Sequence, residues 1–143
     1  MAGKGFRDTF LINVPVADVI LHTIPVGADV GLLVIPDGFN ESVELLSIAI
    51  AANQLVVDGS NVATLDIEFH DDSANSDANL VAAFNLLAAG GNTVLEGTTI
   101  WQGSQIMDPG DRLNAEFTLT TPDTAGLGYH FTLECRIVSR SGD

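Results

Sequence analysis

Apolar and polar residues alternate along three segments of the chain. The first comprises residues 61–71 (NVATLDIEFHD), and the others are residues 112–120 (RLNAEFTLT) and 128–140 (GYHFTLECRIVSR). Because successive side chains of a β-strand point to opposite faces of its sheet, a period of two predicts strands with one buried and one solvated face. Cys135 falls on the apolar face of the last segment, where we expect an inert, buried thiol.

The first half of the chain is more apolar and alternates less regularly. Four further strands are predicted there, with more of both faces covered: residues 8–14, 18–24, 29–35 and 42–50. Proline- and glycine-rich stretches of the kind that form turns separate them. Many short strands without intervening helices predict an all-β fold, an antiparallel β-sandwich of jelly-roll type with about eight strands.

One segment departs from this pattern. The stretch DANLVAAFNLLAAGG is rich in alanine and leucine, its large apolar residues fall on one helical face, and it ends in two glycines. These features predict one short helix near residues 78–89, with Asp77 or Asn79 as its N-cap. A strand from Leu80 to Leu87 is the alternative.

The length and charge of the chain restrict its class. We expect a single domain over residues 1–143, with a short flexible arm (1–8) and a flexible tail (140–143). Five Lys and Arg residues face 19 Asp and Glu residues, a formal charge of −14. Such a surface repels nucleic acid and anionic membranes, so neither is an expected partner. The N-terminal residues contain no secretory apolar core, and we expect synthesis in a cytoplasm.

The acidic stretch around residue 75 raises the question of a metal. Its candidate ligands are Asp71, Ser73, Asn75 and Asp77, which supply oxygen at alternate positions. An EF-hand loop also requires a glycine and a bidentate glutamate, and this stretch has neither at the corresponding positions. We therefore predict a solvated turn, no metal and no cofactor. A calcium loop of another type is the alternative.

Catalytic patterns are not apparent in the sequence. The three histidines (His22, His70 and His130) have no metal-binding spacing. His70 and His130 fall on the polar faces of predicted strands, where we expect lone exposed imidazoles. A G-x-S-x-G nucleophile motif is missing as well. We predict a protein that is not an enzyme and has no catalytic residues.

Two groups of residues are candidate partner contacts. One is the segment TTIWQGSQIMDPGD, predicted to contain a loop around Gly103 to Gln105, with large apolar side chains of types common at interface cores. The other is the N-terminal arm and the strand that follows it. The candidates are Ile100, Trp101, Ile106, Met107, Phe6, Arg7 and Phe10. The alternative for Trp101 is that it fills one end of the sandwich.

Residues 43–73 contain a strand, an Asp-Gly turn and an alternating strand, and residues 103–120 contain a turn followed by another alternating strand. This layout resembles the small β-sandwich virion proteins of tailed bacteriophages, especially the head decoration, or cement, proteins. The resemblance covers residues 40–138 and implies a protein on the capsid exterior that binds the major capsid protein and stabilises the shell. It also implies a homo-oligomer, with a trimer favoured over a dimer, and transfers no catalytic residue.

Other functions remain open at this point. One is a carbohydrate-binding or adhesion module, with or without calcium, whose site would combine Trp101, Tyr129 and the segment from Asp71 to Asn79. Another is a phage tail or fibre component. A small hydrolase would need a buried pair of carboxylates, which a sequence alone does not locate.

Overall fold

Eight β-strands make up the regular structure of the described residues. The computed structural model describes residues 9–16, 29–56, 63–88, 94–119 and 128–138. The strands are β1 (Thr9–Pro15), β2 (Asp29–Val34), β3 (Ser42–Ala52), β4 (Ala63–Asp71), β5 (Ser76–Asn85), β6 (Leu95–Met107), β7 (Arg112–Leu119) and β8 (His130–Val138). The predicted arm, tail and strand at 18–24 lie outside the described residues.

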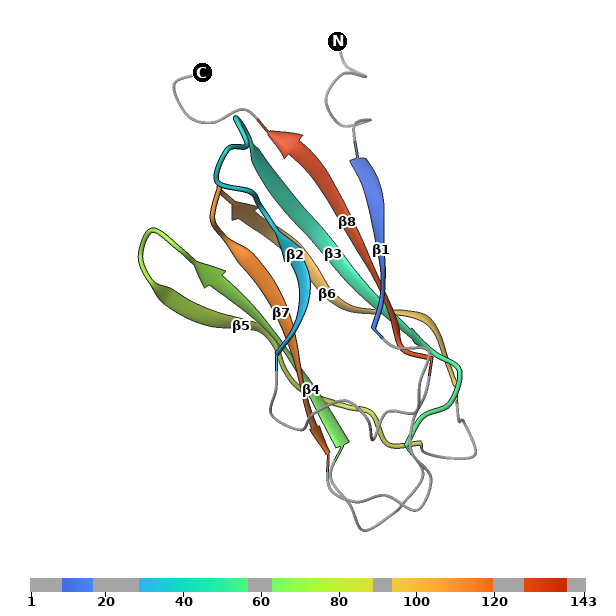
Figure 1. Cartoon of the computed structure of the whole chain (residues 1–143). Coiled ribbons are helices and arrows are strands. Elements are labelled where there is room, and N and C mark those ends of the chain that lie inside the picture. The colour runs from blue at the N-terminus through green and yellow to red at the C-terminus, as the bar shows by residue number, and fades with distance from the viewer. Residues whose placement is uncertain (1–8, 17–28, 57–62, 89–93, 120–127, 139–143) are drawn as a thin grey trace.

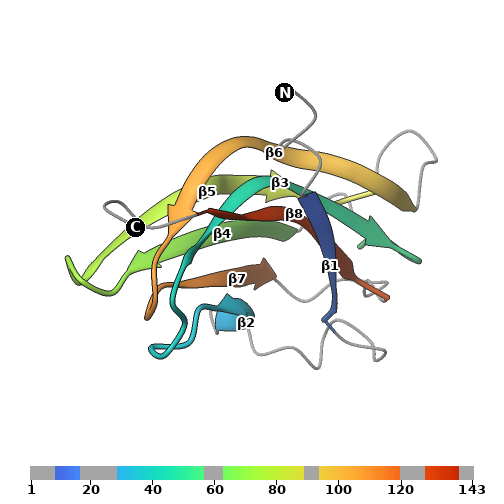
Figure 2. The same cartoon turned by 90° about the horizontal axis from the view of Figure 1, so that it is seen from above.

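The strands form two four-stranded sheets, in the orders β1-β8-β3-β6 and β2-β7-β4-β5 (Figures 1 and 2). All neighbours within these sheets are antiparallel. The first strand pairs with the eighth, the second with the seventh, the third with the sixth and the fourth with the fifth. The described chain is thus a ribbon of nested pairs wrapped into two layers, which is a jelly roll. The predicted all-β, antiparallel sandwich is confirmed.

The alternating segments supply the core between the two layers. In β4 every second residue from Ala63 to Phe69 is buried. In β8 the same holds for Phe131, Leu133 and Cys135, each with no exposed surface. Phe117 of β7 makes edge-to-face ring contacts with Tyr129 and Phe131, at centroid distances of 5.6 and 6.5 Å. The period of two therefore identifies the inner face correctly.

The predicted helix near residues 78–89 is wrong. Residues 76–85 form β5, whose backbone pairs with β4, and the strand alternative is the nearer description. The period of two fails here because the register shifts twice, and Ala83 adopts a φ of 53°. The Asp66 carboxylate accepts the amide of Ala83 at 2.6 Å. Pairing with β4 thus outweighs the modest helix propensity of alanine and leucine.

The predicted loop around Gly103 to Gln105 is also wrong, because β6 runs unbroken to Met107. Its pairing with β3 contains three register shifts, and Gly97 has a φ of 82°. Such bulges place extra residues in one strand and disturb the alternation. The poor alternation of apolar and polar residues in β6 is therefore explained by bulges in an edge strand.

One end of the sandwich carries three short connections, and we call it the turn end. They are residues 35–41 between β2 and β3, 72–75 between β4 and β5, and 108–111 between β6 and β7. β1 begins and β8 ends at the same end (Figure 1). All three of these connections belong to the described residues, whereas each connection at the opposite end contains residues outside them.

Replacing Phe131 by alanine tests the proposed core. Phe131 has no exposed surface, so we expect Phe131→Ala to lower the free energy of unfolding by about 3–5 kcal/mol. Val34, 59% exposed, is the control, and Val34→Ala should change this free energy by less than about 0.5 kcal/mol. Urea denaturation measures both. Equal losses in the two variants would contradict the described packing.

Candidate functional site

Asp111 joins the three connections of the turn end. Its carboxylate accepts the backbone amides of Asp72, at 2.9 Å, and Asp108, at 2.8 Å. Its backbone carbonyl accepts the amide of Ile35 at 2.9 Å. Asp111 is 3% exposed, so these bonds are shielded from water. One buried aspartate therefore fixes the connections before β3, β5 and β7 relative to one another.

Further carboxylates surround this aspartate. Gly110, with a φ of 97°, lies so close to two of them that an added Cβ would sit 2.8 Å from Asp72 Oδ2 and 3.2 Å from Asp37 Oδ1. The Ser42 hydroxyl donates to the Asp108 carboxylate. In the described part of the chain, no group of three or more His, Cys, Asp or Glu residues has the geometry of a metal site. The turn end thus presents carboxylates without gathering them around one point.

The acidic stretch at residues 71–77 is the tip of the β4–β5 hairpin. Asp71 pairs with Ser76, and its carboxylate accepts the Ser73 hydroxyl at 2.9 Å and the Ala74 amide at 3.2 Å. These bonds, that of Ser73 first, lower the pKa of Asp71. Asn75 has a φ of 48°, which asparagine tolerates well. The predicted solvated turn is therefore present.

The remaining candidate ligand, Asp77, points away from Asp71. Asp77 pairs with His70 and bonds its Nδ1 at 2.6 Å. Because Asp77 follows Ser76 along the strand, its side chain lies on the opposite face of the hairpin from Asp71. The two carboxylates at the ends of the proposed ligand run therefore do not converge.

His70 differs from the expectation of an exposed imidazole, because it is only 8% exposed. Its neighbours across the sheet are Asp77 on β5 and Arg112 on β7. Their side chains share the outer face with His70 and flank it. His130, in contrast, is half-buried at the start of β8.

A second buried carboxylate, Glu44, lies on the outer face of the other sheet. It is 7% exposed and accepts Arg136 Nε at 2.6 Å and the Ser104 hydroxyl. The Ser104 bond and, after it, Arg136 lower the pKa of Glu44 against the opposing effect of burial. Sequence reasoning missed this group because it lies within an apolar run, and its partners are 60 and 92 residues away.

The predicted partner contacts have different surroundings. Ile100 and Trp101 are half-buried against the core, and an added Cβ at Gly103 would lie 2.9 Å from the Trp101 ring. Ile106 is 43% exposed, whereas Met107 has no exposed surface, so its assignment as a contact is corrected. Phe10 is 38% exposed. Phe6 and Arg7 lie outside the described residues.

Exposed apolar side chains concentrate toward the turn end. Of the six large ones in the described part of the chain, all but Val94 lie in that half of the sandwich. Val34 is the last residue of β2, and Ile106 and Ile137 are the penultimate residues of β6 and β8. We call these three residues the apolar rim. Sequence reasoning missed Val34 and Ile137 because each belongs to an apolar run that also contains buried residues, Ile35 and Cys135.

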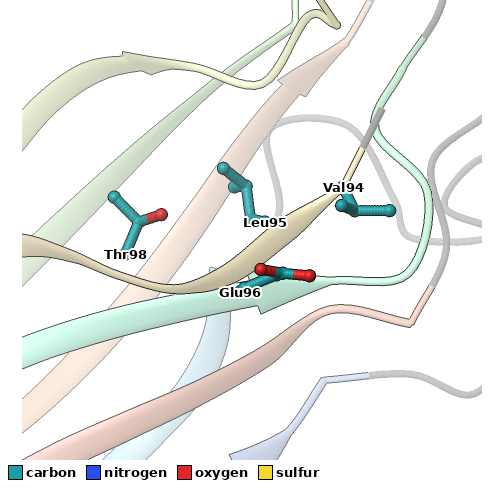
Figure 3. Close-up of a pocket in the computed structure, with 4 residues that line it drawn as sticks. All are labelled: Val94, Leu95, Glu96 and Thr98. Carbon is teal, nitrogen blue, oxygen red and sulfur yellow. The ribbon is translucent and has the colours of Figure 1, made fainter. Parts of the chain in front are cut away.

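A hollow lies near the opposite end, at the start of β6. Val94, Leu95, Glu96 and Thr98 line it (Figure 3). These side chains offer one carboxylate and one hydroxyl. The described lining therefore lacks the second titratable group that acid–base catalysis by a carboxylate pair requires.

Comparison with protein-family models, with curated proteins and with solved structures finds no match to this chain. Among the described residues there is no helix that is long and apolar enough to cross a membrane.

Removing the Asp111 carboxylate should loosen the turn end. We expect Asp111→Ala to lower the free energy of unfolding by about 1–3 kcal/mol, because the amides of Asp72 and Asp108 lose their buried acceptor. The control is Asp37→Ala, which removes an exposed carboxylate from the same end and should not lower stability. Thermal denaturation measures both. A loss as large in Asp37→Ala would show that charge, and not the amide bonds, is responsible.

The Glu44 pair predicts a pH dependence. A lowered pKa means that the ionised carboxylate stabilises the fold fully above the ordinary value of 4.5, and that this contribution is lost as pH falls through the lowered value. In Ser104→Ala we expect the pKa of Glu44 to rise, so that stability falls at a higher pH. Carboxyl NMR titration with thermal melts measures this.

Ser47→Ala is the matched control. Ser47 donates to Glu134 at 3.2 Å on the same sheet, so its removal should leave the Glu44 titration in place. An unchanged Glu44 titration in Ser104→Ala would refute the assigned hydrogen bond.

Proposed function

We propose that this chain is a structural virion protein, a decoration or cement protein that binds the outside of a phage head and stabilises the shell. Its partner is the major capsid protein of the same virion, and it acts as a homo-oligomer. It is made in the host cytoplasm and resides on the capsid exterior. The concentration of exposed apolar side chains at the turn end is the observation that carries this proposal.

The apolar rim supports docking through the turn end. Val34 belongs to one sheet, and Ile106 and Ile137 belong to the other, so the rim involves both layers. Their exposed fractions are 59%, 43% and 40%. Their strand partners place Val34 and Ile106 on the outer faces of different sheets and Ile137 on the side of the inner face, so a partner would have to wrap around the turn end to contact all three. Exposed apolar side chains are typical of protein interaction sites.

The three connections support a preformed contact. Asp111 holds them together with shielded hydrogen bonds, so little conformational entropy remains to be lost when a partner binds. The jelly-roll order adds support at the level of the fold, because virion proteins often use it. Lectins use it too, so the fold alone does not determine the function.

Charge indicates what the partner surface looks like. Asp37, Asp72 and Asp108 are exposed in the connections of the turn end. The complementary surface is apolar at its centre and carries Lys or Arg side chains at its periphery. Binding only to the assembled shell would shift the assembly equilibrium toward the intact particle.

The carbohydrate-binding alternative receives less support. Its site would combine Trp101, Tyr129 and the β4–β5 hairpin. Tyr129 is 2% exposed, and burial raises its pKa. It also precedes β8 at the end opposite the hairpin, and Trp101 is half-buried. These side chains do not share a surface on which a sugar would stack.

Shell binding by two lysine variants tests the proposal. Ile106→Lys places a cation in the rim. Glu44 on β3 is the pairing partner of residue 106, so the new positive charge lies near a carboxylate and we expect the fold to tolerate it. We expect this variant to bind phage heads lacking the protein at least about tenfold more weakly, because a basic partner surface is repelled. Val94→Lys, at the opposite end and 36% exposed, should bind like the parent. Co-sedimentation with purified heads measures occupancy.

Equal occupancy of both variants would eliminate the rim as the contact. Absence of the protein from purified particles would refute the function itself. A dose-dependent rise in melting temperature with calcium would instead favour the adhesion module.

A further inference from the structure

The strand β1 forms one edge of the sheet β1-β8-β3-β6, and its outer side has no neighbour among the described strands. Val16 donates its amide to the Tyr129 carbonyl at 3.0 Å, in the same register that pairs β1 with β8. Backbone groups alternate in direction along a strand, so Ile12 and Val14 also bond β8. The amides of Leu11 and Asn13 therefore point to the free edge.

Pro15 agrees with this assignment. By the same alternation its nitrogen faces the free edge, where the missing N–H breaks no bond to β8. The free edge thus offers the amides of Thr9, Leu11 and Asn13 and the carbonyls of Thr9, Leu11, Asn13 and Pro15.

The other three edge strands are interrupted. The pairing of β2 shifts at Gly31, that of β5 shifts twice, and that of β6 shifts three times. Bulges of this kind are a common protection against edge-to-edge association. The pairing of β1 shows no shift over its seven residues, and Leu11 is 65% exposed on its outer face. Among the described edges, β1 alone is regular.

Charge gives the same distinction. Edge strand β1 (TFLINVP) contains no charged residue, whereas β2 contains Asp29, β5 contains Asp77 and β6 contains Glu96. In a chain of formal charge −14, a second copy meets repulsion wherever carboxylates face each other. Of the four described edge strands, β1 is the one without a carboxylate. The β1 edge of a second copy can therefore approach β1 without this repulsion.

We propose that two copies of this chain pair through β1 in antiparallel orientation, which joins their sheets into one continuous eight-stranded sheet. Antiparallel pairing of identical edges is self-complementary and closes after two copies. The product is a dimer and not the trimer that the family resemblance favours. It does not depend on the proposed shell binding, since the apolar rim contains no residue of β1.

Two variants of equal charge test the pairing. Leu11→Glu places a carboxylate on each copy at the shared edge, and Gln102→Glu adds the same charge on the bulged edge strand β6. By sedimentation over a concentration series, we expect the parent and Gln102→Glu to reach twice the chain mass of 15.0 kDa. The dissociation constant of Leu11→Glu should rise by at least about tenfold.

Amide hydrogen exchange identifies the edge directly. In the parent dimer the amides of Leu11 and Asn13 should be protected, and in Leu11→Glu they should exchange rapidly. The amides of Ile12 and Val14 should stay protected in both, which shows that β1 remains folded on β8. A monomeric parent, a trimer, or a dimer that Leu11→Glu leaves intact would overturn the pairing.

Discussion

Two four-stranded sheets bury one face of each strand against the other, and the remaining features follow from this constraint. The inner positions of β4, β7 and β8 are filled mostly by apolar side chains, and the buried carboxylates Glu44 and Asp111 lie on an outer face and in a connection. Nested pairing brings strands that are distant in the sequence together, so outer side chains meet partners from other parts of the chain. The buried Glu44, whose partners are 60 and 92 residues away, arises in this way, whereas His70 bonds Asp77 within the β4–β5 hairpin.

The excess of acidic residues determines how those outer side chains are satisfied. Five cations are too few to pair with 19 acids. Among the described residues, several carboxylates accept hydrogen bonds from hydroxyls and backbone amides instead. Ser42, Ser73 and Ser104 each donate to a carboxylate. Hydrogen bonds to an ionised acceptor are stronger than neutral ones and bring in no opposing charge. The fold thereby tolerates a large negative charge, and the surface stays acidic.

The sequence predicts the regular half of this architecture and misses the irregular half. Alternation identifies β4, β7 and β8 because neither β1–β8 nor β4–β7 pairing contains a register shift. Alternation fails in β5 and β6, where bulges insert residues that break the period of two. In β5 the alanine-rich composition then leads to the wrong prediction of a helix. The roles of Asp111 and Glu44 depend on contacts across 39 to 92 residues, which no local pattern encodes.

Irregularity also distinguishes the edge for which we propose association from the other described edges. Bulges and carboxylates occur together on β2, β5 and β6, and both discourage another strand from pairing there. The first strand has neither. In our two proposals the surfaces have different tasks. The regular edge would meet an identical edge, and the apolar rim, at an end that also exposes carboxylates, would meet a surface of opposite charge.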